Sequence, residues 1–171
     1  FFKFYLSNIT NGQNFKLKTS KPENGGSILY EIDLSKRSKS DAHGFFSAAI
    51  IGEEINAKNA ISFMTEPFDQ DVSINGRFEG ELNIVTNKKD LDVFMKLYEI
   101  LPDGSYIYLS EYLARASYAK NNEKRELLEP TKYYKFPIKQ SFMTSRKIAK
   151  GSRLLVIFGV NKSKYWEINY G

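Results

Sequence analysis

Cysteine is absent from the 171 residues of this chain. Without a thiol, the chain can form no disulfide, carry no thiolate nucleophile and build no cysteine zinc site. The compartment stays open, because a secreted bacterial protein can also lack cysteine. Long apolar runs are missing too, since none approaches the ~20 residues that a transmembrane helix needs, and no signal-peptide pattern is present. We therefore expect a soluble chain with no membrane partner.

The chain starts at Phe1, without methionine, directly in a strand-like run. This start predicts a piece cut from a longer protein, whose targeting signal would lie upstream. At 171 residues the piece is long enough for one domain with a full core and too short for two ordinary domains. We expect a single domain over residues 1–171, in which residues 1–60 form lead-in strands and a loop excursion and residues 61–171 form the core.

Histidine occurs once, as His43 in Asp41-Ala42-His43-Gly44. It would be the sole candidate for the base of a Ser-His-Asp hydrolase, which takes the proton of the nucleophile and is oriented by an acid. The sequence has no Gly-x-Ser-x-Gly elbow to present a strained, exposed serine. We interpret His43 as an exposed loop residue and expect no catalytic residue and no cofactor in this chain.

Charge gives no nucleic-acid signature, although the net charge is +5. Acidic and basic residues, 20 and 25 in number, are interspersed along the chain. Two local basic groups are Lys120, Lys124 and Arg125, and Arg146, Lys147, Lys150 and Arg153. Neither has the interleaved aromatic platform of a nucleic-acid site, and glutamates dilute the first. We interpret both groups as solvated surface.

Alternating apolar and polar residues are the main structural signal. Residues 78–84 and 91–97 both alternate with period two, as in strands with one buried face. The second run ends at Pro102-Asp103-Gly104, a combination typical of a chain reversal. Residues 2–6 and 15–17 read as a hairpin around Asn11-Gly12.

The remaining runs predict an all-β fold. Residues 106–118, 133–142 and 154–160 are strand-like, and the last is almost continuously apolar, as in a strand covered on both faces. Residues 47–51 could be a further strand and residues 53–58 a single helical turn. Short strands with frequent turns and no useful helical period predict a β-sandwich, and roughly eight strands fit a jelly roll.

Paired carboxylates occur twice, as Asp69-Gln70-Asp71 and Asp90-Leu91-Asp92. Both flank expected turns, where aspartate is favoured as an acceptor for backbone N–H groups. This turn chemistry is the preferred interpretation. As oxygen ligands, Asp90 and Asp92 remain the candidates for a structural Ca²⁺ site, although no EF-hand spacing is present.

Aromatic residues are plentiful, with 13 Phe and 11 Tyr. Tyr106, Tyr108 and Tyr112, expected on one face of a strand, and the Tyr165-Trp166 pair could stack on sugar rings as in carbohydrate-binding jelly rolls. The same residue types are favoured in sheet packing and in contacts between domains. Packing or docking is the preferred interpretation, and carbohydrate binding is the alternative.

Several motifs in a shared order resemble one hydrolase family. They are Ser62-Phe63-Met64-Thr65-Glu66-Pro67, Asn75-Gly76, Asp90-Leu91-Asp92, Leu101-Pro102-Asp103-Gly104, Leu113-Ala114-Arg115-Ala116-Ser117-Tyr118, Leu127-Leu128-Glu129-Pro130, Lys150-Gly151-Ser152-Arg153-Leu154 and Ile168-Asn169-Tyr170-Gly171. From about residue 61 to the end, the chain is similar to the C-terminal domain of X-Pro dipeptidyl-peptidases and of cocaine-esterase-like acyl hydrolases.

This resemblance implies a galactose-binding-like jelly roll that is not catalytic. The serine, acid and histidine would belong to an α/β-hydrolase domain upstream of Phe1, on which this domain packs and whose substrate cleft it helps to enclose. The parent protein would cleave prolyl peptides or esters, and it could also form a homo-oligomer. We place the expected interdomain contact at Phe45, Phe46, Tyr165 and Trp166, which carry large apolar groups outside the regular alternation.

Overall fold

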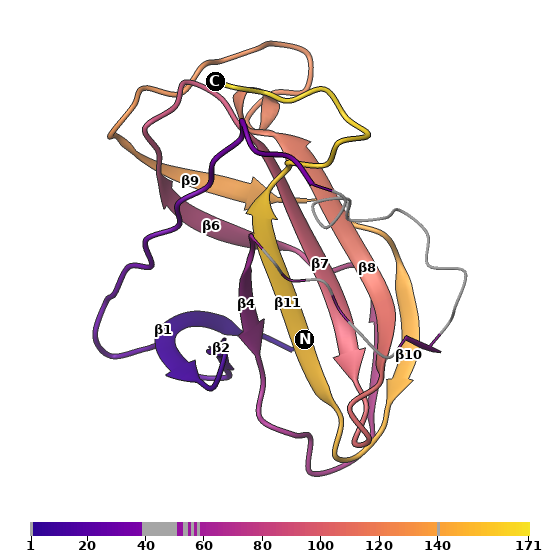
Figure 1. The fold of residues 1–171 in the computed structure, drawn as a ribbon. Coiled ribbons are helices and arrows are strands. Elements are labelled where there is room, and N and C mark those ends of the chain that lie inside the picture. Colours follow the sequence, from indigo (N-terminus) through magenta and orange to yellow (C-terminus); the bar gives the residue numbers. More distant parts are fainter. Residues whose placement is uncertain (1, 39–50, 53–54, 56, 58, 140) are drawn as a thin grey trace.

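The computed structural model describes residues 2–38, 51–52, 55, 57, 59–139 and 141–171. Within them the chain forms eleven β-strands, one 3₁₀ turn and no α-helix, so no described helix could span a membrane (Figure 1). The elements are β1 Tyr5–Asn11, β2 Asn14–Lys18, β3 Ile51–Gly52, β4 Ile61–Met64, β5 Val72–Gly76, β6 Gly80–Val85, β7 Asp92–Ile100, β8 Tyr106–Arg115, η2 Ala116–Tyr118, β9 Tyr133–Ile138, β10 Thr144–Ile148 and β11 Arg153–Val160. The interpretations of His43, Phe45 and Phe46 concern residues outside this described part.

The strands from β4 to β11 pair in a nested, antiparallel order. β4 pairs with β11, β5 with β10, β6 with β9 and β7 with β8. This is the pairing expected when an eight-stranded antiparallel ribbon is rolled into a jelly roll. The predicted all-β jelly-roll sandwich is therefore confirmed, and the hairpin β1–β2 and the short β3 are additions at the two edges of its larger sheet.

The sandwich has one seven-stranded sheet, ordered β1-β2-β4-β11-β7-β8-β3, and two two-stranded sheets, β10-β5 and β6-β9. Both small sheets contribute buried residues to clusters with the same face of β7 and β11. Leu82 and Phe136 join Val93 there, and Val72 and Ile148 join Leu154. We call this covered side the inner face of the large sheet, and the opposite side the outer face.

β7 lies between β11 and β8 and is buried on both of its faces. Val93 and Met95 belong to the inner core, while Phe94 and Tyr98 pack on the outer face against Ile157. The prediction of one buried face for residues 91–97 is therefore wrong, because residues from the stretch before β4, such as Ile55 and Ala60, cover the outer face as well. The prediction that β11 is covered on both faces is confirmed.

A β-bulge in β8 changes which residues share a face. Leu97 pairs with Ser110 and Tyr98 with Tyr108, so Leu109 is an extra residue between these pairs. One inserted residue reverses the alternation beyond it. Tyr108 consequently lies with Tyr98 on the outer face, whereas Tyr112 lies inside, and the expectation of one tyrosine face is wrong.

Three strands, β4, β5 and β10, are not among the runs predicted above, and one hairpin lies later than expected. β5 and β10 have few apolar residues, since each needs to bury only one face, and Ile148 is fully buried while its neighbours are not. β1 begins at Tyr5 rather than Phe2, but its predicted turn is confirmed at Gly12, whose φ of 62° favours glycine.

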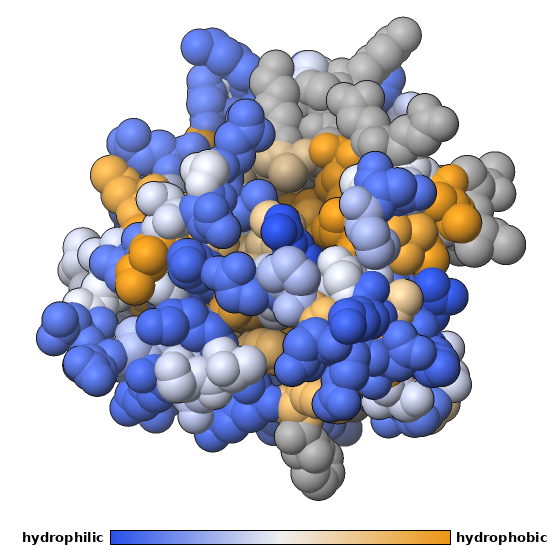
Figure 2. Space-filling model, turned by 90° about the horizontal axis from the view of Figure 1, so that it is seen from below, coloured by the Kyte–Doolittle hydropathy of each residue, from blue (hydrophilic) through white to orange (hydrophobic). Residues whose placement is uncertain are grey.

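One end of the sandwich is closed by partly buried aromatic and aliphatic side chains. Phe4, Phe68 and Leu101 pack there against the Val72 and Ile148 cluster. Figure 2 views the molecule from below in the orientation of Figure 1 and shows apolar residues gathered toward the centre and one side, among hydrophilic ones. These three side chains come from the segment before β1 and from the loops after β4 and β7.

Candidate functional site

A hydrolytic centre is not assembled in the part of the chain that the structure describes. His43, the only histidine of the chain, lies outside the described residues. No group of three histidine, aspartate or glutamate side chains that could hold a metal ion occurs among the described residues. The polar chemistry of the domain lies instead in buried carboxylates and their partners.

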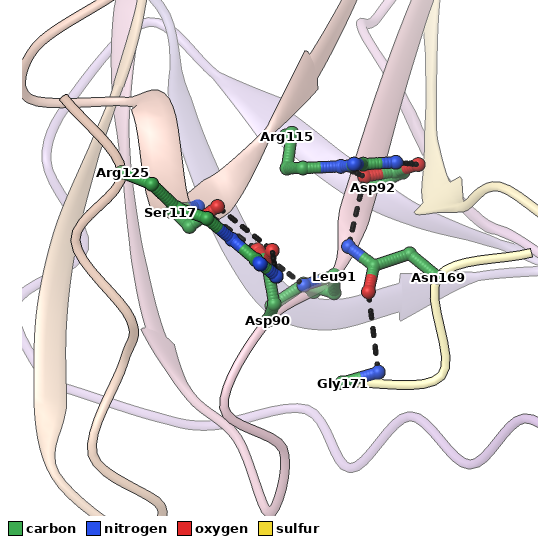
Figure 3. Close-up of polar contacts among 8 residues, drawn as sticks. All are labelled: Asp90, Leu91, Asp92, Arg115, Ser117, Arg125, Asn169 and Gly171. Carbon is green, nitrogen blue, oxygen red and sulfur yellow. Dashed lines mark hydrogen bonds and ion pairs between the residues drawn. The ribbon is translucent and has the colours of Figure 1, made fainter. Parts of the chain in front are cut away.

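Asp90 precedes β7 and is the most completely engaged of these carboxylates (Figure 3). Its side chain is fully buried and accepts hydrogen bonds from the Ser117 backbone N–H at 2.9 Å and the Ser117 hydroxyl at 2.7 Å. Arg125 Nη2 lies 3.1 Å from the same carboxylate. Burial alone would raise the pKa of Asp90, but these bonds outweigh it and hold the pKa below its usual value.

Asp92, two residues on, joins three parts of the chain. Arg115 on β8 contacts both carboxylate oxygens, at 2.8 and 3.0 Å, in a bidentate pair. Asn169, near the last residue, donates to Asp92 Oδ1 at 3.1 Å (Figure 3). The two Ca²⁺ candidates are therefore surrounded by hydrogen-bond donors and cations, which fasten the C-terminal segment to β7 and β8.

The other predicted polar residues also form internal contacts. Asp71 accepts from the Lys150 backbone N–H and pairs with Lys147 at 2.8 Å. These contacts join the region of β5 to that of β10 rather than closing a local turn, and both Asp69 and Asp71 are exposed. Arg146 donates to the fully buried Glu99 at 2.8 Å. Both basic groups thus contribute ion pairs to neighbouring carboxylates, Arg125 from the first and Arg146 and Lys147 from the second.

A second buried pair lies on the outer face of the large sheet. Lys96 Nζ on β7 is 3.8 Å from Glu111 Oε2 on β8, and both side chains are 9% exposed. Burial lowers the pKa of Lys96, and the charge of Glu111 partly offsets this effect. The pair borders a small hollow of about 20 Å³ that is also lined by Phe94, Leu113 and Trp166.

Trp166 lies beside this hollow on the segment after β11. Arg37 donates to the carbonyl oxygens of Ser163 and Trp166, the latter at 2.7 Å, and so ties this segment to the N-terminal part of the chain. The Trp166 side chain is 43% exposed and that of Tyr165 is 73% exposed. The segment therefore carries two partly exposed aromatic side chains on a backbone that Arg37 fixes through two hydrogen bonds.

The predicted tyrosine platform is not assembled as one surface. Tyr98 packs edge-on against both Tyr106 and Tyr108, with ring centroids 5.5 and 5.7 Å apart. Tyr112 packs inside against Phe136 and donates to the Pro137 carbonyl. The three predicted tyrosines are thus divided between the two faces of the sheet.

A groove of about 470 Å³ lies beside the last residues of β8, from Glu111 to Arg115. Leu113, Tyr118 and Phe142 line it, and their side chains are 39%, 36% and 58% exposed. Leu113 and Glu111 line both this groove and the hollow beside Trp166. We call Leu113, Tyr118, Phe142 and Trp166 the β8-edge surface.

The sequence predicted Trp166 as a contact residue but not the rest of this surface. It also did not predict the ion pairs of Lys96 with Glu111 and of Glu99 with Arg146. Lys96 and Glu99 were visible as charges inside a strand that is otherwise apolar on both faces, and such charges require a buried partner. Leu113 and Phe142 gave no comparable signal, because each lies in a run that reads as ordinary strand.

Comparison with known proteins assigns a family over nearly the whole chain. Residues 3–171 match the family described as the X-Pro dipeptidyl-peptidase C-terminal non-catalytic domain. No curated protein matches the chain.

Solved structures with a similar fold come from hydrolases. An aminopeptidase from the marine sediment archaeon Thaumarchaeota archaeon superposes with a TM-score of 0.72 at 16% identity, over 93% of this chain and 29% of that chain. An α-amino acid ester hydrolase gives 0.68 at 18% identity, over 92% and 28%. A CocE/NonD family hydrolase from Staphylococcus aureus gives 0.52 at 15% identity, over 65% and 25%. The chain thus spans less than a third of each of these proteins.

Proposed function

The chain belongs to the family of X-Pro dipeptidyl-peptidase C-terminal non-catalytic domains, and from this we propose that it serves a serine hydrolase as its accessory β-sandwich. By itself the chain is not catalytic. In the proposal it packs on an upstream α/β-hydrolase domain and forms part of the wall of the substrate cleft. The parent enzyme cleaves prolyl peptides or esters by acyl transfer to serine.

The family match over residues 3–171 is the observation that carries this proposal. The similar solved structures are an aminopeptidase, an ester hydrolase and a CocE/NonD hydrolase, and the matched region is less than a third of each, so most of each lies outside it. In the proposal, a domain that supplies no catalytic residue contributes to the enzyme through the surface with which it contacts the rest of the parent protein.

The β8-edge surface is our candidate for the contact with the hydrolase domain. Interfaces within one chain are enriched in partly exposed aromatic and aliphatic groups near polar ones. Trp166, Leu113 and Phe142 fit this description, and the neighbouring Lys96–Glu111 pair is already neutralised within the domain. Tyr165 directly precedes Trp166 in the chain. Phe45 and Phe46 lie outside the described residues and stay predicted contacts.

Chemical cross-linking of the intact parent protein tests this packing. Lys139 lines the groove and Lys164 precedes the exposed aromatic pair, so both amines are expected to cross-link to residues upstream of Phe1. The matched controls are Lys132, which directly precedes β9, and Lys135, which lies within β9 in the opposite layer. Both should give few such cross-links. Links from Lys132 and Lys135 without any from Lys139 and Lys164 would place the interface elsewhere.

Carbohydrate binding, the alternative, predicts a different result at Trp166. Because we assign Trp166 to a contact between domains, simple sugars and polysaccharides should leave its fluorescence in the isolated chain unchanged. Trp166 is the only tryptophan of the chain, so the signal is unambiguous. A saturable shift with one glycan that disappears in Trp166→Ala would establish the alternative.

A further inference from the structure

Over its last residues, the side of β8 that faces away from β7 pairs with no strand in the described part of the chain. β3 pairs with β8 only at Tyr106 and Ile107, and next along the edge the Phe142 N–H donates to the Glu111 carbonyl at 3.3 Å. Beyond Glu111, no described strand lies beside β8. The residues from Tyr112 to Arg115 therefore form the edge that borders the groove.

The direction of the backbone groups along this edge follows from the pairing with β7. The Asp92 carbonyl accepts from Asn161 N–H on the β11 side, so Asp92 and Arg115 form a pair without mutual hydrogen bonds. Alternation then turns the N–H and C=O of Arg115, Leu113 and Glu111 away from β7, in agreement with the bond from Phe142. Tyr112 and Ala114 point toward β7 instead. Leu113 thus offers both a donor and an acceptor to the groove.

Within the residues that the structure describes, the stretch from Tyr112 to Ala114 shows none of the features that usually protect sheet edges from pairing. Proteins block open edges with proline, with lysine, with bulges or with a covering segment. The bulge at Leu109 and the strand β3 protect the other half of β8, whereas Tyr112, Leu113 and Ala114 carry no charge. The walls beside them, Tyr118 and Phe142, are partly exposed aromatic rings.

We infer that an extended segment of the hydrolase part of the parent chain lies in this groove and adds a strand to β8, with Leu113 exchanging main-chain hydrogen bonds with it. Strand addition of this kind draws its affinity from backbone hydrogen bonds and its specificity from pockets for alternate side chains. The inference rests on the proposed function and adds to it the place and the manner of contact.

Length and charge both indicate this occupant. The matched solved structures are more than three times as long as this chain, so an ample length of polypeptide is present in such proteins to supply a segment. Of the charged groups that line the groove, Arg115 pairs with Asp92 and Glu111 with Lys96, and Lys139 adds one exposed cation. The groove therefore suits a mainly apolar segment without basic groups, which stays covalently linked to the domain.

Hydrogen exchange of the intact parent protein tests the added strand at single-residue resolution. We expect the Leu113 amide to exchange as slowly as the amides of Tyr112 and Ala114, which bond to β7. If Leu113 exchanges at the rate of a solvent-exposed amide while Ala114 stays protected, the inference is wrong. Protection of Leu113 that disappears on dilution would identify a second copy as the occupant and would also overturn it.

Two variants at Leu113 separate the backbone contact from side-chain packing. Proline at this edge position removes an N–H that faces away from β7, so Leu113→Pro should leave β7–β8 pairing in place. In the intact parent it should raise the rate of proteolytic release of the domain by at least about tenfold. Leu113→Ala keeps the backbone N–H and should therefore raise the rate of proteolytic release less than Leu113→Pro. Equal effects of the two variants would contradict an added strand.

The outcome for the proposed function is separate. If cross-links and activity show a docked domain while Leu113 exchanges freely, the proposed function stands and the added strand fails. If the domain shows no contact with the rest of the parent, both fail.

Discussion

Replacing Asp90 with alanine should destabilise the domain by about 3 kcal/mol. The change leaves the buried backbone N–H and hydroxyl of Ser117 without their acceptor, and an unsatisfied buried donor costs about 1–3 kcal/mol. Loss of the Arg125 contact adds less, because the Arg125 side chain is 51% exposed and water screens its charge. Urea unfolding of the isolated chain measures the change in free energy.

The same carboxylate makes stability depend on acidity. Because the folded-state pKa of Asp90 lies below its usual value, its contribution is fully present above the unfolded-state pKa of about 4 and is lost as the pH falls below it. Asp90→Asn removes the titrating group. The Asp90→Asn domain should therefore be less stable than the unsubstituted domain at pH 7. The difference in their free energies of unfolding should become smaller as the pH falls below about 4.

Asp92→Ala is the matched control for Asp90→Ala. Arg115, the partner of Asp92, is 45% exposed, and partly exposed ion pairs contribute about 1 kcal/mol or less. The control should therefore cost clearly less than Asp90→Ala. Equal losses of stability in the two variants would show that the burial of the Asp90 carboxylate does not add to the cost of removing it.

Trp166→Asp should impair the intact enzyme while leaving the isolated domain folded. Trp166 is 43% exposed and belongs to none of the three core clusters, so the isolated domain should lose some packing area but stay folded. At the centre of an interface, an aromatic residue commonly contributes 2 kcal/mol or more, about a 30-fold change in the docking equilibrium. If the domain forms part of the cleft wall, as proposed, its displacement disturbs substrate positioning, and kcat/KM of the parent should fall by at least about tenfold.

Tyr133→Asp provides the control, since Tyr133 is a 61% exposed aromatic residue on β9 in the opposite layer. Its kcat/KM should stay within about twofold of the unmodified parent, as is usual for exposed positions away from special features. Unfolding of the isolated domain by Trp166→Asp, or equal losses of activity in the two variants, would remove Trp166 from the docking surface.

The alternation of residues predicted the class of fold but not the sharing of faces. Strand-like runs predicted β6, β7, β8, β9 and β11, the last from its almost continuous apolar run, and the count of roughly eight strands led to the jelly roll. The reversal of Tyr112 could not be predicted, because the bulge at Leu109 depends on which residues of β7 stand opposite it. β5 and β10 escaped because strands that bury one face of a small sheet need few apolar residues.

The candidate surface was predicted in part. Trp166 was recognisable as a large aromatic residue outside the alternation, and the structure places it beside Leu113 at the hollow next to β8. The combination with Tyr118 and Phe142 arises from three separate segments that only the fold brings together. A local sequence pattern carries no information on such a surface.

Labelling of the intact parent protein with a serine-directed phosphonate, followed by mapping of the modified residue, tests most directly the claim that this chain is the non-catalytic part of a serine hydrolase. The account predicts stoichiometric modification of one serine upstream of Phe1 and none within residues 1–171, and it predicts no modification of the isolated chain. Stoichiometric modification of any serine within residues 1–171 would contradict it.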